Sequence, residues 1–147
     1  GLPTLACIRP AVKALQDLGM HRKVQLIVSG GIRSGADVAK ALALGADAVA
    51  IGTAALVALG DNDPHLEEEY RALGTTAGAY DDVKAGRRLS NYLKVMTLEA
   101  QTVARACGKS HLHNLEPEDL CALTVEAAAM AQVPIAGTGW IPGRGGY

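Results

Sequence analysis

Two short glycine-containing segments are the residues of this sequence best suited to chemistry, and that chemistry is the binding of a phosphate group. They are Ser29-Gly30-Gly31-Ile32-Arg33 and Gly52-Thr53. Glycine permits positive φ angles and lets a ligand approach bare backbone N–H groups. The start of a following helix adds further N–H donors and a favourable dipole. Arg33 would offset negative charge. The alternative interpretation is that these glycines only form tight turns.

A strand–helix–strand unit must position both segments. The apolar run Gln25–Val28 is bounded by charge and by glycine, which predicts a strand buried on both faces, and Asp47–Ile51 predicts the next. Between them a helix is expected from Ser34, its N-cap, to Leu44, with Gly45 after its end. Short connections of this kind require parallel strands. Both segments therefore reach the same edge, where (β/α)8 barrels place phosphate sites after the seventh and eighth strands.

Outside this unit, a short helix-like run is expected at Ala54–Leu59, and three further helices are expected. Arg9–Leu18 shows a helical apolar stripe with Pro10 near its start, where the missing N–H is harmless. Ala85–Cys107 has apolar residues at intervals of three or four and predicts a long helix. Pro117 is expected to open another helix, followed by a Gly-rich extended tail.

Length and composition limit the class of protein. The chain has 147 residues, too few for a complete barrel of about 250. Hydrophobic residues make up 49% and aromatic residues 3%, typical of closely packed α/β layers. The net charge of −1 gives no indication of nucleic acid or anionic membrane as a partner, and no apolar run is long enough to cross a bilayer. Without a signal peptide or an initial methionine, we expect a fragment or processed product of a cytoplasmic protein.

Cysteine and histidine positions do not indicate a metal centre. Cys7, Cys107 and Cys121 are odd in number and far apart, so reduced thiols are expected rather than disulfides or a zinc or iron–sulfur site. His111 and His113 could form a metal-binding pair, but they follow Gly108 in an expected helix–helix loop. No metal site is predicted.

The stretch SGGIRSGADVAKALALGADAVAIGTAAL resembles the seventh and eighth βα units of the FMN-dependent barrel in the glutamate synthase family. More distantly it is similar to other FMN or nucleotide-phosphate barrels, including 2-hydroxy-acid oxidases, type 2 isopentenyl-diphosphate isomerase and inosine-monophosphate dehydrogenase. The segment with Gly86–Leu89, Asn91–Leu93 and Glu99 is similar to the helices that follow the barrel in glutamate synthases, and it selects that family. By this resemblance, the residues that surround the FMN phosphate, mostly through backbone amides, are Ser29, Gly30, Gly31, Ile32, Gly52 and Thr53.

Two departures from the family pattern limit what the resemblance implies. Glutamate synthases carry an iron–sulfur cluster on closely spaced cysteines just after the last barrel strand, whereas residues 60–82 read GDNDPHLEEEYRALGTTAGAYDD, without cysteine. A cluster within this chain is therefore not expected. Asp82 also runs almost directly into Val83, where relatives have a longer connection. Either a shortened loop or a stretch missing from the sequence would explain this.

The resemblance implies a C-terminal portion of a (β/α)8 barrel followed by a helical extension. Residues 1–60 would be the last βα units, 61–82 a polar Gly-rich connection, and 83–147 the extension and tail. The implied activity is FMN-dependent reduction of an imine, formed from a 2-oxo acid and ammonia or an amine, to glutamate or an N-substituted glutamate. Catalytic residues are not assigned, because the other barrel strands or other subunits would supply them. The alternatives are a barrel that binds a nucleotide or sugar phosphate without redox chemistry, and a structural fragment of a larger complex.

Overall fold

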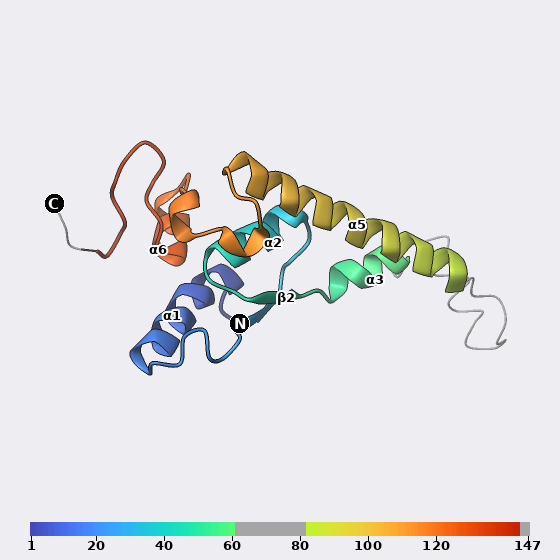
Figure 1. Cartoon of the computed structure of the whole chain (residues 1–147), viewed down its shortest axis with the longest axis horizontal. Helices are drawn as coiled ribbons and strands as arrows, with labels where there is room; N and C mark the ends of the chain where they lie inside the picture. Colours follow the sequence, from blue (N-terminus) through green and yellow to red (C-terminus); the bar gives the residue numbers. More distant parts are fainter. Residues whose placement is uncertain (61–81, 145–147) are drawn as a thin grey trace.

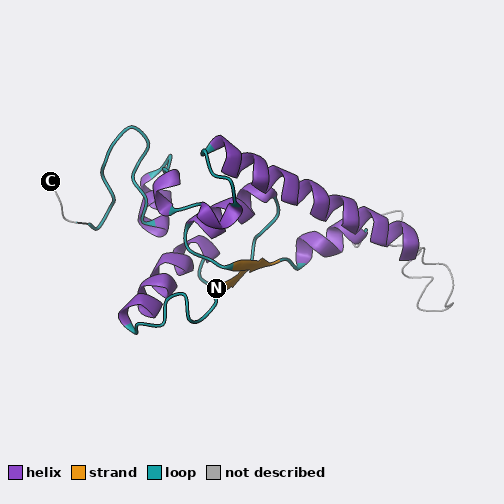
Figure 2. Cartoon of the chain, in the orientation of Figure 1, coloured by secondary structure: helices purple, strands orange, loops and turns teal. Residues whose placement is uncertain are grey.

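The computed structural model describes residues 1–60 and 82–144, in which helices pack beside a small parallel sheet (Figure 1). The elements in chain order are α1 (Thr4–Asp17), β1 (Ile27–Ser29), α2 (Gly35–Ala43), β2 (Ala48–Ala50), α3 (Thr53–Leu59), α5 (Asp82–Ala106), the 3₁₀ turns η1 (Leu112–Asn114) and η2 (Pro117–Asp119), and α6 (Val125–Ala131). Figure 2 shows the strands at the centre, with helices and long loops around them. The predicted α/β class is confirmed.

The predicted strand–helix–strand unit is present. β1 pairs with β2 in parallel, with Val28 opposite Val49. α2 connects them and begins as expected, because the Ser34 hydroxyl oxygen accepts a hydrogen bond from the Asp37 amide at 3.2 Å. Its C-terminal turn ends at Gly45, whose amide donates to the Leu42 carbonyl oxygen at 2.9 Å.

α2 lies between two apolar clusters and organises the packing. One cluster joins it to α1, β1 and α6 through residues such as Val12, Val28 and Leu44. The other joins it to α5 and consists of the buried residues Ala39, Ala43, Ala104 and Leu115. The small alanine side chains let α2 and α5 approach closely. As a result, α5 runs along α2 and α3 for much of its length (Figure 1).

The first helix begins earlier than predicted. α1 starts at Thr4, so Pro10 lies inside the helix rather than near its start. A proline in this position removes one backbone hydrogen bond. Ile8 and Val12 lie one turn apart, and both are buried in the core (4% and 3% exposed). Their burial on one face stabilises helical structure on both sides of Pro10.

The two strands are shorter than predicted, and the expectation that they are buried on both faces is wrong. Val28 is 7% exposed, but Ile27 is 63% exposed, and both ends of β2 are exposed. The apolar core covers the face of the sheet that carries Val28. The opposite face, which carries Ile27, is left largely exposed by the elements within residues 1–60 and 82–144.

The helix predicted from Pro117 is also incorrect. Pro117 opens only the 3₁₀ turn η2, and α6 begins separately after Thr124, whose hydroxyl oxygen accepts from the Ala127 amide at 3.1 Å. Between them Ala122 pairs with the tail, because its amide donates to the Pro134 carbonyl and its carbonyl accepts from the Ala136 amide, each at 2.8 Å. Pairing with the tail holds this stretch extended and excludes a continuous helix.

The long helix is confirmed, with α5 running from Asp82 to Ala106. The predicted connection 61–82 lies outside the described residues except for Asp82, which is the first residue of α5. Among the described helices, none has the length and apolar character needed to cross a membrane.

Candidate functional site

The two glycine segments meet at one open cavity of about 580 Å³. The register of the parallel strands explains this, because β1 and β2 end side by side at Ser29 and Ala50. All six residues predicted for the phosphate site line the cavity: Ser29, Gly30, Gly31, Ile32, Gly52 and Thr53. Arg33, also noted from the sequence, lines it too, together with Ala50, Ala54, Val57 and Tyr92.

The first loop depends on its paired glycines. Gly30 has φ of +108° and Gly31 has φ of +73°, a region that side-chain-bearing residues rarely adopt. The Thr4 hydroxyl, at the start of α1, donates to the Gly30 carbonyl oxygen at 2.9 Å. Ile32 is 8% exposed, and its side chain belongs to the main apolar cluster. The loop is thus held at Gly30 by a hydrogen bond and at Ile32 by core packing.

Backbone N–H groups at this cavity are available to a ligand. In residues 1–60 and 82–144, no acceptor is paired with the amides of Gly31, Ile32, Gly52 or Thr53. A Cβ atom added to Gly31 or Gly52 would also meet nothing within 4 Å. Unpaired donors next to open space are what an anionic group such as phosphate requires.

The start of α2 does not contribute donors in the way that the sequence predicted. The Gly35 amide donates to Glu99 Oε2 at 2.7 Å, and the Asp37 amide donates to Ser34 Oγ. The preceding amide of Arg33 donates to Asp37 Oδ2 at 3.0 Å. Side chains therefore occupy three of the expected donors, and one of these side chains comes from α5. The amides of Gly31, Ile32, Gly52 and Thr53 are not occupied in this way in the described part of the chain.

Charge at the cavity comes mainly from Arg33. Its guanidinium Nε lies 3.6 Å from Asp37 Oδ2, and its side chain is 80% exposed. An exposed pair of this kind is weak and rearranges at little cost. Arg33 can therefore turn toward an anionic ligand at the cavity while Asp37 retains its hydrogen bond to the Arg33 amide.

Tyr92 of α5 was not predicted as a site residue. It is half-buried, lines the cavity, and its hydroxyl donates to the Arg33 carbonyl oxygen at 2.6 Å. Burial raises the pKa of Tyr92, and the negative charges of Asp37 and Glu99 raise that pKa further. The phenol thus remains a protonated donor at neutral pH. Tyr92 is one of only four tyrosines in a chain without phenylalanine, and this rarity was the one feature of the sequence that could have drawn attention to it. Its contact with the loop could not be predicted, because the two are far apart in the sequence.

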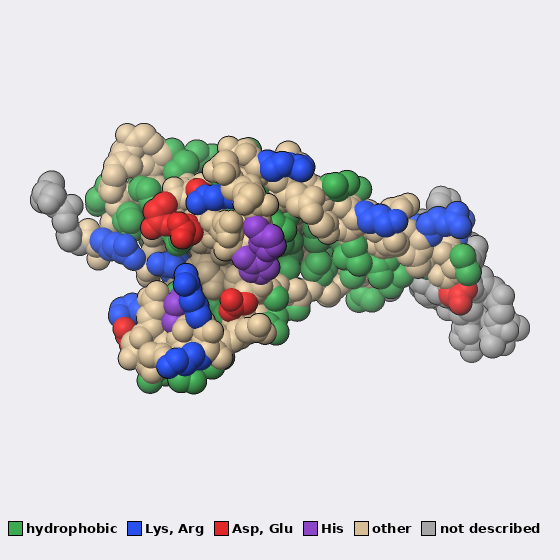
Figure 3. Space-filling model, in the orientation of Figure 1, with side chains coloured by type: hydrophobic (Ala, Val, Ile, Leu, Met, Phe, Trp, Pro, Cys, Tyr) green, Lys and Arg blue, Asp and Glu red, His purple; other side chains and the backbone are tan. Residues whose placement is uncertain are grey.

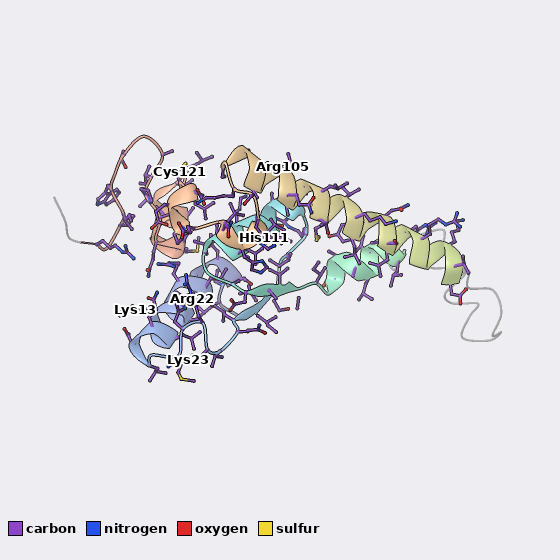
Figure 4. All side chains as sticks on the ribbon, in the orientation of Figure 1. Lys13, Arg22, Lys23, Arg105, His111 and Cys121 are labelled. Atoms are coloured by element: carbon purple, nitrogen blue, oxygen red, sulfur yellow. The ribbon has the colours of Figure 1, made fainter. Side chains whose placement is uncertain are left out.

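The remaining metal-ligating side chains do not assemble into a site in the part of the chain that the structure describes. His111 and His113 stack on each other with ring centroids 5.3 Å apart, and His113 Nε2 lies 2.9 Å from the Asp47 carbonyl oxygen. Figure 3 shows histidine surface at the centre of the molecule, and Figure 4 places Cys121 beside α6, away from His111. The contacts of His111 and His113 give this pair a structural role.

Comparisons with known proteins agree with the resemblance. The model of the family described as "Conserved region in glutamate synthase" matches residues 1–110. The chain is 76% identical over 170 residues to a glutamate synthase large subunit-like protein of Rhizobium meliloti (strain 1021), covering 100% of this chain and 38% of that protein. It is 35% identical over 129 residues to the archaeal glutamate synthase [NADPH] of Methanocaldococcus jannaschii, covering 78% of this chain and 24% of that protein.

A more distant relative is named for an activity other than glutamate synthesis. The chain is 38% identical over 93 residues to an isopentenyl-diphosphate delta-isomerase of Deinococcus radiodurans, covering 59% of this chain and 26% of that protein. No solved structure matches the chain significantly. The alignment with the Rhizobium protein is longer than the 147 residues of this chain, so that protein has residues there that this chain lacks. A shortened connection at Asp82–Val83 and a stretch missing from the sequence would each produce such a difference.

Proposed function

The chain belongs to the glutamate synthase family, and on this basis we propose that it carries the FMN phosphate site of a glutamate synthase-type oxidoreductase. It spans 38% and 24% of the two glutamate synthase relatives, so the proposed enzyme is a larger polypeptide or complex. In that enzyme β1 and β2 would be the seventh and eighth strands of a (β/α)8 barrel. The remaining strands, or other subunits, would supply the substrate-binding groups.

The observation that carries this proposal is the convergence of both glycine loops on one cavity. Four loop amides there, those of Gly31, Ile32, Gly52 and Thr53, have no acceptor in the described part of the chain. The absence of side chains at Gly31 and Gly52 leaves space beside those donors. These features fit a phosphate monoester such as that of FMN, with Ser29 and Gly30 completing the wall of the site.

The chain's own residues would bind and orient the cofactor. The loop amides would hold the phosphate, and Arg33 at the rim would offset part of its charge. In its reduced form, bound FMN would supply the two electrons that reduce an imine, formed from a 2-oxo acid and ammonia or an amine, to glutamate or an N-substituted glutamate. Among the described residues, no group of three or more side chains could hold a metal ion.

The absorption spectrum of the complete polypeptide or complex tests the proposal. We expect oxidised flavin bands and release of FMN on denaturation. After anaerobic reduction, the flavin should be reoxidised when a 2-oxo acid is added together with ammonia or a primary amine, and not when either is added alone. A complete protein that neither contains flavin nor takes up added FMN would refute the proposed cofactor.

A second candidate function is phosphate recognition without net redox chemistry. It is favoured by the match to the Deinococcus isomerase, whose name specifies isopentenyl diphosphate. The same amide-lined cavity could hold a phosphate of that kind. Two results on the complete protein would together favour this second candidate. The reduced flavin would not be reoxidised by the pairs of 2-oxo acid and amine tested, and the protein would bind a diphosphate ester.

A further inference from the structure

Two side chains of α5 reach across to the backbone that follows the first glycine loop. The Tyr92 hydroxyl donates to the Arg33 carbonyl oxygen at 2.6 Å, and Glu99 Oε2 accepts from the Gly35 amide at 2.7 Å. Tyr92 and Glu99 are seven residues apart, which is close to two helical turns, so both extend from the same face of α5. They bind the backbone immediately before and after Ser34, the N-cap of α2.

Close backbone packing fixes the distance over which these side chains act. Gly35 is buried, and a Cβ atom added there would overlap the Met96 carbonyl oxygen and the Ala100 amide nitrogen of α5. Met96 and Ala100 are 5% and 1% exposed. The absence of a side chain at Gly35 thus allows α5 to approach α2 at the point where the loop enters the helix. Along α5, Tyr92 lies one turn before Met96, and Glu99 is itself part of this contact, because its Cβ is among the atoms nearest to the added Cβ.

The glycine loop is the part of the site that most needs such support. Gly30 and Gly31 have the widest conformational freedom of any residue type, and fixing them costs entropy. Thr4 holds the loop at the Gly30 carbonyl. The Tyr92 bond holds it at the Arg33 carbonyl, three residues further on. With both ends fixed, the amides of Gly31 and Ile32 are kept at the cavity before a ligand arrives.

We propose that α5 braces the first glycine loop, with Tyr92 and Glu99 as positioning residues that set the affinity for the phosphate end of the ligand. This inference rests on the proposed FMN site but assigns a role to residues outside the glycine loops. The extension after the sheet would then take part in cofactor binding as well as in packing.

Replacing Tyr92 in the complete protein tests the brace at the phosphate. Tyr92→Phe removes only the hydroxyl, and we expect FMN affinity to fall roughly fivefold, the value of one hydrogen bond. Affinity for riboflavin, which lacks the phosphate, should be unchanged. Both are measured by fluorescence titration of the apoprotein. The matched control is Thr97→Val, which deletes a hydroxyl on the same helix whose bond goes to the Leu93 carbonyl of α5 itself. It should alter neither affinity.

Glu99 is tested without any cofactor, by hydrogen exchange of the apoprotein. Glu99→Ala should increase exchange in the peptide that covers residues 31–37, because the Gly35 amide loses its acceptor. Glu99→Gln retains an acceptor oxygen at the same position and should restore slow exchange. Unchanged exchange in Glu99→Ala, or failure of Glu99→Gln to restore it, would refute the role of Glu99.

The outcomes separate this inference from the proposed function. If the unmodified complete protein binds no FMN, the proposed cofactor is wrong, and the exchange experiment still tests the brace. If it binds FMN and Tyr92→Phe leaves FMN affinity unchanged, the brace is wrong and the proposed cofactor stands. An equal loss of FMN and riboflavin affinity in Tyr92→Phe would also overturn the brace, because the effect would then not lie at the phosphate.

Discussion

Gly31 and Gly52 are the residues at which the candidate site is most sensitive to a single change. Both line the cavity, and neither would bring an added Cβ within 4 Å of another atom. Gly31 also has a positive φ, so a substitution there would combine backbone strain with loss of space. Gly52 has φ of −112°, and a substitution there is governed by the space it fills. Gly52 therefore gives the cleaner experiment.

Gly52→Val should weaken FMN binding by the complete protein while leaving its folding intact. The valine side chain would enter the open space beside the loop amides and prevent one of them from reaching the phosphate. Loss of one charge-assisted hydrogen bond costs about 2 kcal/mol, or roughly thirtyfold in Kd. Gly139→Val, also in open space but outside the residues that line the cavity, is the control. Equal FMN affinities of the two variants in a fluorescence titration would show that the phosphate lies elsewhere.

At the scale of elements, α2 and α5 form the contact on which the site depends. Alanines on both helices form a small cluster, Ala39, Ala43 and Ala104 with Leu115. Glu99 of α5 caps the first amide of α2. Because these contacts include residues that flank the glycine loop, a change in the spacing of the two helices should affect both stability and ligand binding.

Gly35→Ala and Gly86→Ala should have opposite effects on the complete protein. At Gly35 the methyl group would overlap backbone atoms of α5, and overpacking of this kind costs about 2 kcal/mol. At Gly86, in α5, an added Cβ meets nothing within 4 Å, so the higher helix propensity of alanine should stabilise by up to about 1 kcal/mol. Thermal unfolding of the two variants measures both effects. A stable Gly35→Ala variant with unchanged FMN affinity would contradict the close α2–α5 contact.

At the scale of the molecule, the described part of the chain leaves much apolar surface uncovered. In Figure 3, hydrophobic side chains gather where α3 lies beside α5. Ile27 is 63% exposed, Leu56 50% and Val95 63%. β1 and β2 pair only with each other among the described residues, so the outer edge of each is without a partner strand there. Unpaired strand edges and exposed apolar surface favour association with other chains.

We therefore expect the isolated 147-residue chain to self-associate, and the complete protein to be a defined species. Sedimentation velocity at several concentrations measures this directly. The isolated chain should show sedimentation coefficients that rise with concentration, whereas those of the complete protein should not. If the isolated chain is instead a monodisperse monomer that unfolds cooperatively, its exposed apolar surface does not require contact with other chains.

Local patterns in the sequence were sufficient for most of the elements. The Ser34 cap, the Gly45 terminator and the apolar periodicity of α5 act within a few residues, so their predictions were confirmed. Predictions failed where distant contacts compete with local preference. Core packing of Ile8 and Val12 extends α1 through Pro10, and pairing of Ala122 with the tail interrupts the helix predicted from Pro117.

By itself, the sequence determined the family, the parallel strand–helix–strand unit and six of the residues that line the cavity. Only the tertiary structure decided that α5 occupies the first amide of α2 and holds the backbone that follows the first glycine loop. The contacts that decide this, Glu99 to the Gly35 amide and Tyr92 to the Arg33 carbonyl, join residues 64 and 59 positions apart. Periodicity and capping rules describe residues within one or two turns of each other, so they cannot indicate that a carboxylate from a later helix occupies the start of α2.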